Sequence, residues 1–151
     1  MIREQIKAKL VEAMKSKNEK ATATLRLINA AIKDKDIEAR SKGNMDGIDD
    51  AGVLSLLQTM IKQRRESIAM YEKGGRSDLV AAEQGEIDII QTFLPKQLSD
   101  EEVKAAIQTL ITETGATSVK DMGKVMGALK AKYAGQIDMG KASGLIKAAL
   151  G

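Results

Sequence analysis

The sequence predicts an all-α protein, and three observations support this prediction. Apolar residues recur every three or four positions through successive segments, which is the spacing of one helical face, and no segment alternates as a strand does. Aromatic residues make up only 2% of the chain, so the core must be built from aliphatic side chains, as in helix bundles. The single proline, Pro95, separates two groups of helices. We expect an N-terminal helical domain of about four helices over residues 1–94, a hinge over 95–98 and a small three-helix bundle over 99–151.

The first two helices are expected over residues 2–16 and 20–42. The apolar stripe of the first consists of Ile2, Ile6, Leu10 and Met14, each four residues after the last. The second carries Leu25, Ile28 and Ile32 along one face, and Gly43 marks its end. The following residues, GNMDGIDD, combine Gly and Asp and predict an exposed loop that ends with Asp49 or Asp50 as the cap of the next helix.

Two further helices are expected before the proline, over residues 51–73 and from Ser77 or Asp78 to Leu94. Gly74 and Gly75 separate them. The apolar residues predicted to face inward are Val53, Leu54, Leu57, Ile61, Ile68 and Tyr71 in the first helix, and Leu79, Ile87, Ile90 and Leu94 in the second. Short connections favour antiparallel neighbours.

Pro95 must stop a helix, because proline has no N–H to donate and pushes the preceding residue, Leu94, out of the α region. A new helix is predicted almost at once, since Ser99 followed three residues later by Glu102 is a capping box. The residues between, PKQL at 95–98, are the predicted hinge.

The C-terminal part is expected to contain three short helices. The first runs from Ser99 to about Glu113, with Val103, Ile107, Leu110 and Ile111 inward. Ser118 and Asp121 form a second capping-box pattern, which predicts a helix to Tyr133 with Val119, Met122, Met126 and Leu129 inward. Asp138 is the expected cap of the last helix, where Leu145, Ile146 and Leu150 pack.

The composition excludes several classes of function. Without His or Cys the chain has no thiolate nucleophile, no Ser-His-Asp triad and no zinc site with the usual ligands. Any catalysis would have to rest on carboxylates, Lys, Tyr or Ser, and we assign no catalytic residue, no metal and no cofactor. No apolar run approaches the roughly 20 residues that span a bilayer, and the first residues lack the apolar core of a signal peptide. These observations predict a soluble, cytoplasmic protein with no membrane partner.

One candidate site is an acidic set before the proline, Glu83, Glu86 and Asp88, with Glu72 and Asp78 nearby. Glu83 and Glu86 share a helical face, as paired carboxylates in acid–base or metal chemistry do. The alternative that we favour is structural: a polar network across a helix interface. Its predicted members are Arg64, Arg65, Arg76, Asp78, Glu83 and Glu86. The basic run from Lys62 to Arg65 is read in the same way, as solvated or ion-paired in preference to a phosphate site.

Two features of the C-terminal part bear on nucleic-acid binding. Gly123 and Gly127 lie one turn apart inside a predicted helix, where each Gly costs about 1 kcal/mol relative to Ala and where a second backbone could approach closely. We favour a neighbouring helix over a nucleic-acid strand as that second backbone. From residue 120 onward six lysines stand against two acids, Asp121 and Asp138. The lysines are Lys120, Lys124, Lys130, Lys132, Lys141 and Lys147.

The lysine-rich end has two interpretations, contact with the phosphates of an RNA through its shape or ordinary solubilising charge. Sequence-specific reading of a single strand is not expected, because Tyr133 is the only aromatic residue available for stacking.

Read together, the motifs resemble the GatB/YqeY family, and the whole chain resembles a stand-alone YqeY-like protein. The residues that carry this resemblance are Leu25-Arg26, Lys62-Gln63-Arg64 with Ser67, Gly75-Arg76-Ser77-Asp78-Leu79, Glu83, Glu86, Phe93-Leu94-Pro95, Gly123-Lys124-Val125-Met126, Gly135, Asp138 and Lys141. Phe93 departs from the family pattern, which has Tyr before Leu-Pro, and so lacks a hydroxyl group.

The resemblance implies an all-helical fold whose C-terminal part is similar to the tail domain of the B subunit of the tRNA-dependent amidotransferase, an appendage that contacts tRNA. It favours a non-catalytic module that binds tRNA or structured RNA through Lys120, Lys124, Lys130, Lys132 and Lys141. The alternatives are an enzyme or accessory in tRNA amidation, with carbon–nitrogen ligase activity that uses glutamine as amide donor, and an adaptor for an amidotransferase or another translation protein.

Overall fold

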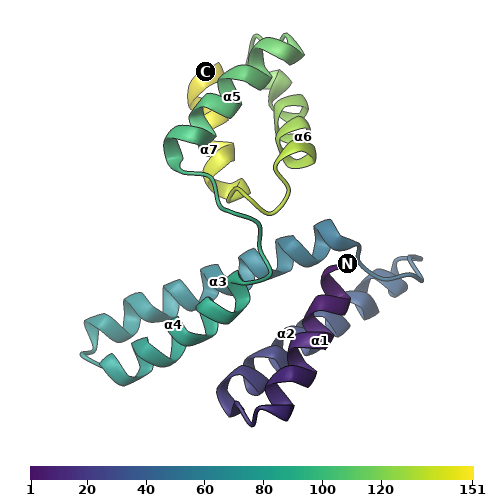
Figure 1. The fold of residues 1–151 in the computed structure, drawn as a ribbon. Coiled ribbons are helices and arrows are strands. Elements are labelled where there is room, and N and C mark those ends of the chain that lie inside the picture. The colour runs from purple at the N-terminus through teal and green to yellow at the C-terminus, as the bar shows by residue number, and fades with distance from the viewer. The chain divides into compact units, whose positions relative to one another are not determined.

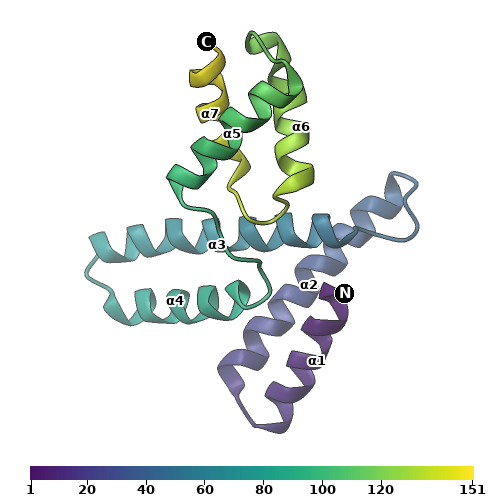
Figure 2. The same ribbon diagram turned by 45° about the horizontal axis from the view of Figure 1, so that its top comes forward.

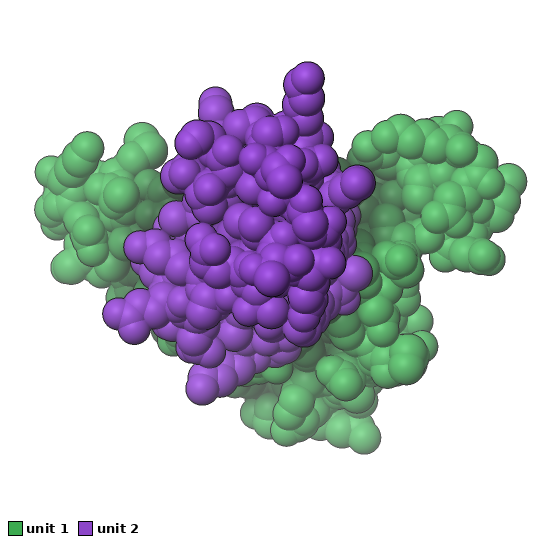
Figure 3. Space-filling model, turned by 90° about the horizontal axis from the view of Figure 1, so that it is seen from above, with its two compact units in different colours: residues 1–94 green, residues 95–151 purple.

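The computed structural model describes residues 1–151 and contains seven α-helices, one short 3₁₀-helix and no strand, which confirms the all-α prediction (Figures 1 and 2). The chain divides into two compact units, Met1–Leu94 and Pro95–Gly151, which Figure 3 colours separately. The helices of unit 1 are α1 (Ile2–Lys15), α2 (Glu19–Ser41), α3 (Asp50–Lys73) and α4 (Ser77–Gln91). Those of unit 2 are α5 (Asp100–Thr114), the 3₁₀-helix η1 (Val119–Asp121), α6 (Met122–Lys132) and α7 (Met139–Leu150).

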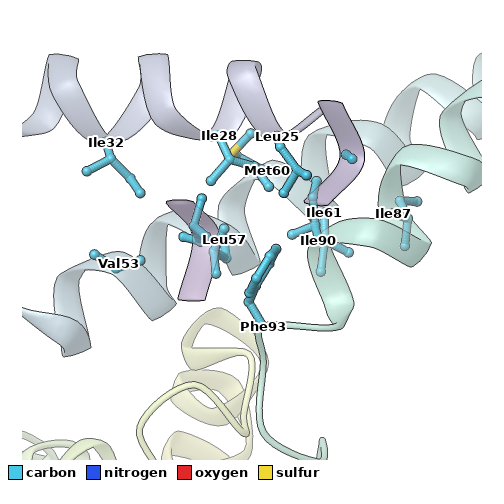
Figure 4. Close-up of a cluster of buried hydrophobic side chains, with 12 residues drawn as sticks. Leu25, Ile28, Ile32, Val53, Leu57, Met60, Ile61, Ile87, Ile90 and Phe93 are labelled. Atoms are coloured by element: carbon cyan, nitrogen blue, oxygen red, sulfur yellow. The ribbon is translucent and has the colours of Figure 1, made fainter. Parts of the chain in front are cut away.

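Unit 1 consists of two helical hairpins, α1 with α2 and α3 with α4, and α4 also packs against α2 (Figure 1). Its core is aliphatic, as the composition requires, with Phe93 as its one aromatic ring. Figure 4 shows side chains from α2, α3 and α4 converging in this core. Among them, Ile28, Leu57 and Ile90 are fully buried. Of the residues predicted to face inward in these helices, eight are buried and five are half-buried. The buried ones are Leu25, Ile28, Ile32, Val53, Leu57, Ile61, Ile87 and Ile90, and the half-buried ones are Leu54, Ile68, Tyr71, Leu79 and Leu94.

The apolar stripe predicted for the first helix is wrong at its end. Met14 is 51% exposed, and Ala13 is buried in its place. Each residue turns a helix by about 100°, so a spacing of exactly four residues drifts by about 40° at every step. Seven residues after the buried Ile6, Ala13 is about 20° off the same line, whereas Met14 is about 80° off it.

An ion pair that the sequence did not reveal joins the start of α1 to the end of α2. The Arg3 guanidinium donates to both Asp36 oxygens, at 2.8 and 2.6 Å, and to the Ile48 carbonyl at 2.7 Å. Asp36 also accepts from the Ile48 N–H at 2.9 Å. This clamp holds the loop between α2 and α3, and a Cβ on Gly47 would collide with the Asp36 side chain. The hydrogen bond from Arg3, aided by that from Ile48, lowers the pKa of Asp36 from 3.8 to about 2.

The boundaries of α4 differ from the prediction at both ends. Ser77 and Asp78 lie inside the first turn, and Arg76 occupies the cap position without a side-chain capping bond. The helix stops at Gln91, three residues before Leu94. Thr92, Phe93 and Leu94 each donate their N–H to the carbonyl three residues earlier, at 3.2, 3.2 and 3.1 Å. These tighter turns take the chain out of the α conformation before it reaches Pro95.

Unit 2 is a bundle of α5, α6 and α7 around a second aliphatic core that includes Val103, Ile107, Leu129 and Ile146. The predicted capping box of α5 is confirmed: Ser99 Oγ accepts from Glu102 N at 3.2 Å, and Glu102 Oε1 accepts from Ser99 N at 3.3 Å. The predicted cap Asp138 is also confirmed, accepting from the N–H groups of Gly140 and Lys141.

The second predicted capping box is wrong in its partners. Ser118 makes no capping bond, and residues 119–121 form η1 before α6 begins. The Asp121 carboxylate instead accepts from Thr117 N at 3.0 Å and from its hydroxyl at 3.4 Å. The bond from the Thr117 N–H lowers the pKa of Asp121. Val119, which was predicted to face inward, is 42% exposed because of this extra turn. Val125, which was not predicted to face inward, is fully buried in the core.

The segment predicted as a hinge is partly bound to unit 2. Gln97 Nε2 donates to the Gly135 carbonyl at 2.6 Å, and Leu98 N donates to the Gln136 carbonyl at 3.0 Å. The second half of PKQL therefore belongs to unit 2 as structure, and movement about residues 95–98 stays a prediction.

Candidate nucleic-acid interface

The candidate interface is the outward face of α6, and the packing of the helix defines it. Val125 and Leu129 are fully buried and fix the inward direction. At about 100° per residue, Gly127 lies about 180° from the middle of this pair, and Gly123 about 140° from it. Lys124 and Lys130 lie about 120° from the inward direction, one on each side. The outward face is thus a strip of glycine backbone between two lysines.

The glycine strip is open. A Cβ added to Gly123 or Gly127 would meet no atom within 4 Å. No neighbouring helix therefore packs closely against either glycine. The interpretation that these glycines make room for another helix of unit 2 is therefore wrong. What they leave is a stretch of helix backbone without side chains, which a second molecule could approach closely.

The structure does not bring all five predicted lysines to this strip. Lys120 belongs to η1 and is exposed. Lys132 is the last residue of α6, and its ammonium lies 5.7 Å from the centre of the Tyr133 ring. Lys141, on α7, forms an ion pair with Asp100 at 3.5 Å. Lys124 and Lys130 are therefore the two predicted residues that flank the open backbone.

The polar network predicted in unit 1 is only partly assembled. Arg64 Nε donates to Glu86 Oε2 at 2.8 Å across the α3–α4 interface, and Arg64 also donates to the Met60 carbonyl at 3.1 Å. Arg76 and Asp78 pair with each other at 3.1 Å. This contact is local and lowers the pKa of Asp78.

The remaining members of that network, Arg65 and Glu83, have no partner in the structure. No group of three carboxylates comes together as metal ligands would, Glu83, Glu86 and Asp88 included. In addition, none of the seven helices is both long enough and apolar enough to cross a bilayer.

Comparison with known proteins gives one family. The model of the family described as Yqey-like protein matches residues 3–150. Among curated proteins, the chain is similar to three fungal proteins that share the name altered inheritance of mitochondria protein 41, mitochondrial. It is 34% identical to the one from Lachancea thermotolerans over 110 residues, covering 72% of this chain and 57% of the relative.

The other two relatives are covered more fully. The Saccharomyces cerevisiae protein is 32% identical over 130 residues, 82% of this chain and 68% of the relative. The Pyrenophora tritici-repentis protein is 35% identical over 135 residues, which cover 85% of this chain and 71% of the relative. The chain thus spans little more than half of the Lachancea protein. Because all three carry the word mitochondrial in their names, this comparison contradicts the predicted cytoplasmic location.

Proposed function

Since this chain belongs to the YqeY-like family, we propose that it is a non-catalytic helical module that binds tRNA or structured RNA through the outward face of α6. The observation that carries the proposal is the open backbone at Gly123 and Gly127 between Lys124 and Lys130. A lysine on each side of a strip without side chains suits a phosphate backbone, because the ammonium groups reach phosphates while the ribose edge approaches the helix.

Charge supports this choice of face. Residues 120–151 carry six lysines and two acids, and one of those acids, Asp138, is occupied as a helix cap. The resemblance to the tRNA-contacting tail of the amidotransferase B subunit agrees with it. The absence of aromatic residues from the strip favours recognition of RNA shape over the reading of individual bases.

The test is binding of bulk tRNA, measured by filter retention at about 50 mM and about 200 mM salt. We expect Lys124→Glu with Lys130→Glu to weaken binding at least tenfold and to lower the slope of log affinity against log salt by about two. The matched control is Lys96→Glu with Lys104→Glu, which changes the net charge of unit 2 equally at exposed sites outside α6. Equal losses in both pairs would refute the α6 face, and no binding at the lower salt would refute RNA binding itself.

The names of the relatives extend the proposal to a mitochondrial setting, so the RNAs tested should include mitochondrial tRNA. Preference for a tRNA over a duplex of equal length would point to recognition of its tertiary shape. Equal affinity for both would point to recognition of helical geometry alone.

The resemblance also motivates a second candidate, an accessory role in tRNA amidation, in which the chain assists glutamine-dependent formation of a carbon–nitrogen bond. We propose no chemical step for this chain. Adding it to a purified tRNA-dependent amidotransferase with misacylated tRNA and glutamine tests the role. A changed rate that persists in Glu83→Gln and disappears in Lys124→Glu with Lys130→Glu would place the effect in RNA contact; loss of the effect in Glu83→Gln would assign this carboxylate a part in it.

A further inference from the structure

Unit 1 contains an open pocket that the proposed RNA function does not use. It lies where the second half of α1, the start of α2 and the end of α4 meet, and its volume is about 240 Å³. Its apolar lining is provided by Ala13, Ala21, Leu25, Ile89 and Phe93. Ala13, Leu25 and Phe93 are buried in the core, so the floor of the pocket is a surface of the core itself.

The floor suits an apolar group for two reasons. Two of its residues are alanines, whose small side chains leave the space that a larger residue would fill. In addition, the aromatic residue is Phe93, so no phenol oxygen enters the site. A ligand group in this space would be removed from water against the carbon atoms of these side chains, which favours an apolar group.

The unused hydrogen-bond donors of the rim belong to Asn18 and Lys9, because the hydroxyl donors of Ser16 and Thr92 are already engaged. The hydroxyls of Ser16 and Thr92 donate to carbonyls of their own helices, at 3.2 and 2.6 Å. Asn18 Oδ1 accepts from Ala21 N at 3.1 Å as the cap of α2, which leaves the two hydrogens on Nδ2 without a partner. Ala21 belongs to the first turn of α2, so the positive end of the helix dipole also lies at this rim.

Lys9 and Glu12 complete the rim. They form an exposed ion pair at 3.3 Å, with side chains that are 58% and 69% exposed. Pairs of this kind are weak, so an incoming anion could take the place of the Glu12 carboxylate next to Lys9. Glu12 would oppose that anion, and its removal should therefore help binding.

From these contacts we propose that the pocket is a binding site for a small organic acid, with an apolar body on Ala13, Ala21 and Phe93 and a carboxylate directed to Lys9 and Asn18. The volume lies below the roughly 300 to 1,000 Å³ of pockets for drug-sized ligands. It therefore selects an acid of about ten to twelve non-hydrogen atoms, for which a dissociation constant of about 1 mM is expected.

The probe is 4-phenylbutyrate, with its neutral amide, 4-phenylbutyramide, as the matched compound. Titration of the ¹⁵N-labelled protein should shift the backbone amide signals of Asn18, Ala21 and Phe93 with one common dissociation constant. The acid should bind at least threefold more tightly than the amide. Shifts spread over both units, or none at these residues at about ten times the expected constant, would overturn the proposal.

Three substitutions, each with a control on α2, separate the parts of the site. Ala21→Leu fills the floor and should weaken binding at least tenfold, whereas Ala23→Leu, on the exposed side of α2, should not change it. Lys9→Gln should weaken the acid about threefold and leave the amide unaffected, and Glu12→Gln should tighten the acid. The Lys35–Glu38 pair has the same spacing and the same distance of 3.3 Å, so Lys35→Gln and Glu38→Gln are the controls.

The two proposals fail separately, because the variants that test tRNA binding are in α6 and those that test the pocket are in α1 and α2. Circular dichroism of Ala21→Leu confirms that the helices remain. If that variant unfolds, Lys9→Gln and Glu12→Gln still test the proposal. Unchanged affinity for the acid in both variants would show that no carboxylate binds at this rim.

Discussion

The two units use their charged residues differently although both are close to neutral. Residues 1–94 carry sixteen Lys and Arg against fifteen acids, and residues 95–151 carry eight against six. Unit 1 contains six of the seven ion pairs, including the two formed by arginines between different helices, Arg3–Asp36 and Arg64–Glu86. Unit 2 contains a single pair, Lys141–Asp100, at 3.5 Å. Pairing, more than net charge, decides which cations are free for a polyanion.

Burial separates the two arginine pairs between helices from the pair of unit 2. The side chains of Arg64 and Glu86 are 14% and 32% exposed, while those of Lys141 and Asp100 are 69% and 74% exposed. Arginine also presents several donors at fixed angles, so Arg3 can hold both oxygens of Asp36 and a carbonyl at once. Unit 2 has no arginine, and its lysine contacts are solvated and weak.

The largest test of this contrast is removal of the Arg3–Asp36 clamp. Asp36→Ala leaves the Arg3 guanidinium and the Ile48 N–H without their partner, and we expect it to lower the free energy of unfolding by about 2 to 3 kcal/mol. The control is Asp34→Ala, an exposed acid on the same helix that forms no ion pair, which should change stability by less than about 0.5 kcal/mol. Chemical denaturation measures both; equal effects would show that the clamp contributes nothing specific.

The same clamp predicts the acid response of unit 1. The folded pKa of Asp36, about 2, lies below its ordinary value of 3.8, so the unfolded chain binds the proton more readily. Stability from this group is complete above about pH 4 and is lost as the pH falls through about 2. Asp36→Asn should flatten this part of the stability curve, measured by thermal unfolding from pH 5 to pH 2. A variant with the wild-type slope would assign the acid loss to other carboxylates.

A smaller effect is expected from the pair between α3 and α4. Glu86→Ala should lower the free energy of unfolding by about 1 to 2 kcal/mol, because Arg64 is largely buried and loses its carboxylate. Asp100→Ala, which breaks the exposed pair of unit 2, should cost less than about 0.5 kcal/mol. Similar losses in the two variants would contradict the division between structural and free charges.

The glycines of α6 give a change of opposite sign. Gly127→Ala should raise stability by about 0.5 to 1 kcal/mol, because the position is helical and nothing lies within 4 Å of the added Cβ. Gly85→Ala in α4 is equally open and should give a similar gain. If RNA uses the bare backbone, only Gly127→Ala weakens tRNA binding. Unchanged binding would show that RNA does not approach the glycine backbone closely, although the lysines could still contact it.

The sequence predicted features whose partners lie a few residues apart. The caps Asp49, Ser99 and Asp138 were found because a capping side chain bonds to its own first turn. The fully buried residues of α2 and α3 were found because helical spacing is regular. The stripe of α1 failed at Met14 only through accumulated rotation, and the Ser118 cap failed because an intervening 3₁₀ turn shifted the register.

Features made by distant segments were not predicted. Arg3 and Asp36 are 33 residues apart, and nothing in the local pattern of either marks the other. The pocket draws on α1, α2 and α4, so no contiguous motif encodes it. The lysines of the candidate interface were found by composition, but only the packing of unit 2 separates Lys124 and Lys130 on the outward face of α6 from Lys132 beside Tyr133 and Lys141 on α7. Orientation around a helix axis depends on tertiary packing, which composition does not contain.

The two hydrogen bonds from Gln97 and Leu98 determine where the polypeptide can be cut for separate production of its halves. A C-terminal fragment that starts at Ser99 would lose both bonds and would place a charged terminal ammonium at the cap of α5. A fragment that starts at Pro95 keeps the hydrogen bonds to the carbonyls of Gly135 and Gln136. The same cut leaves the N-terminal half intact through Leu94.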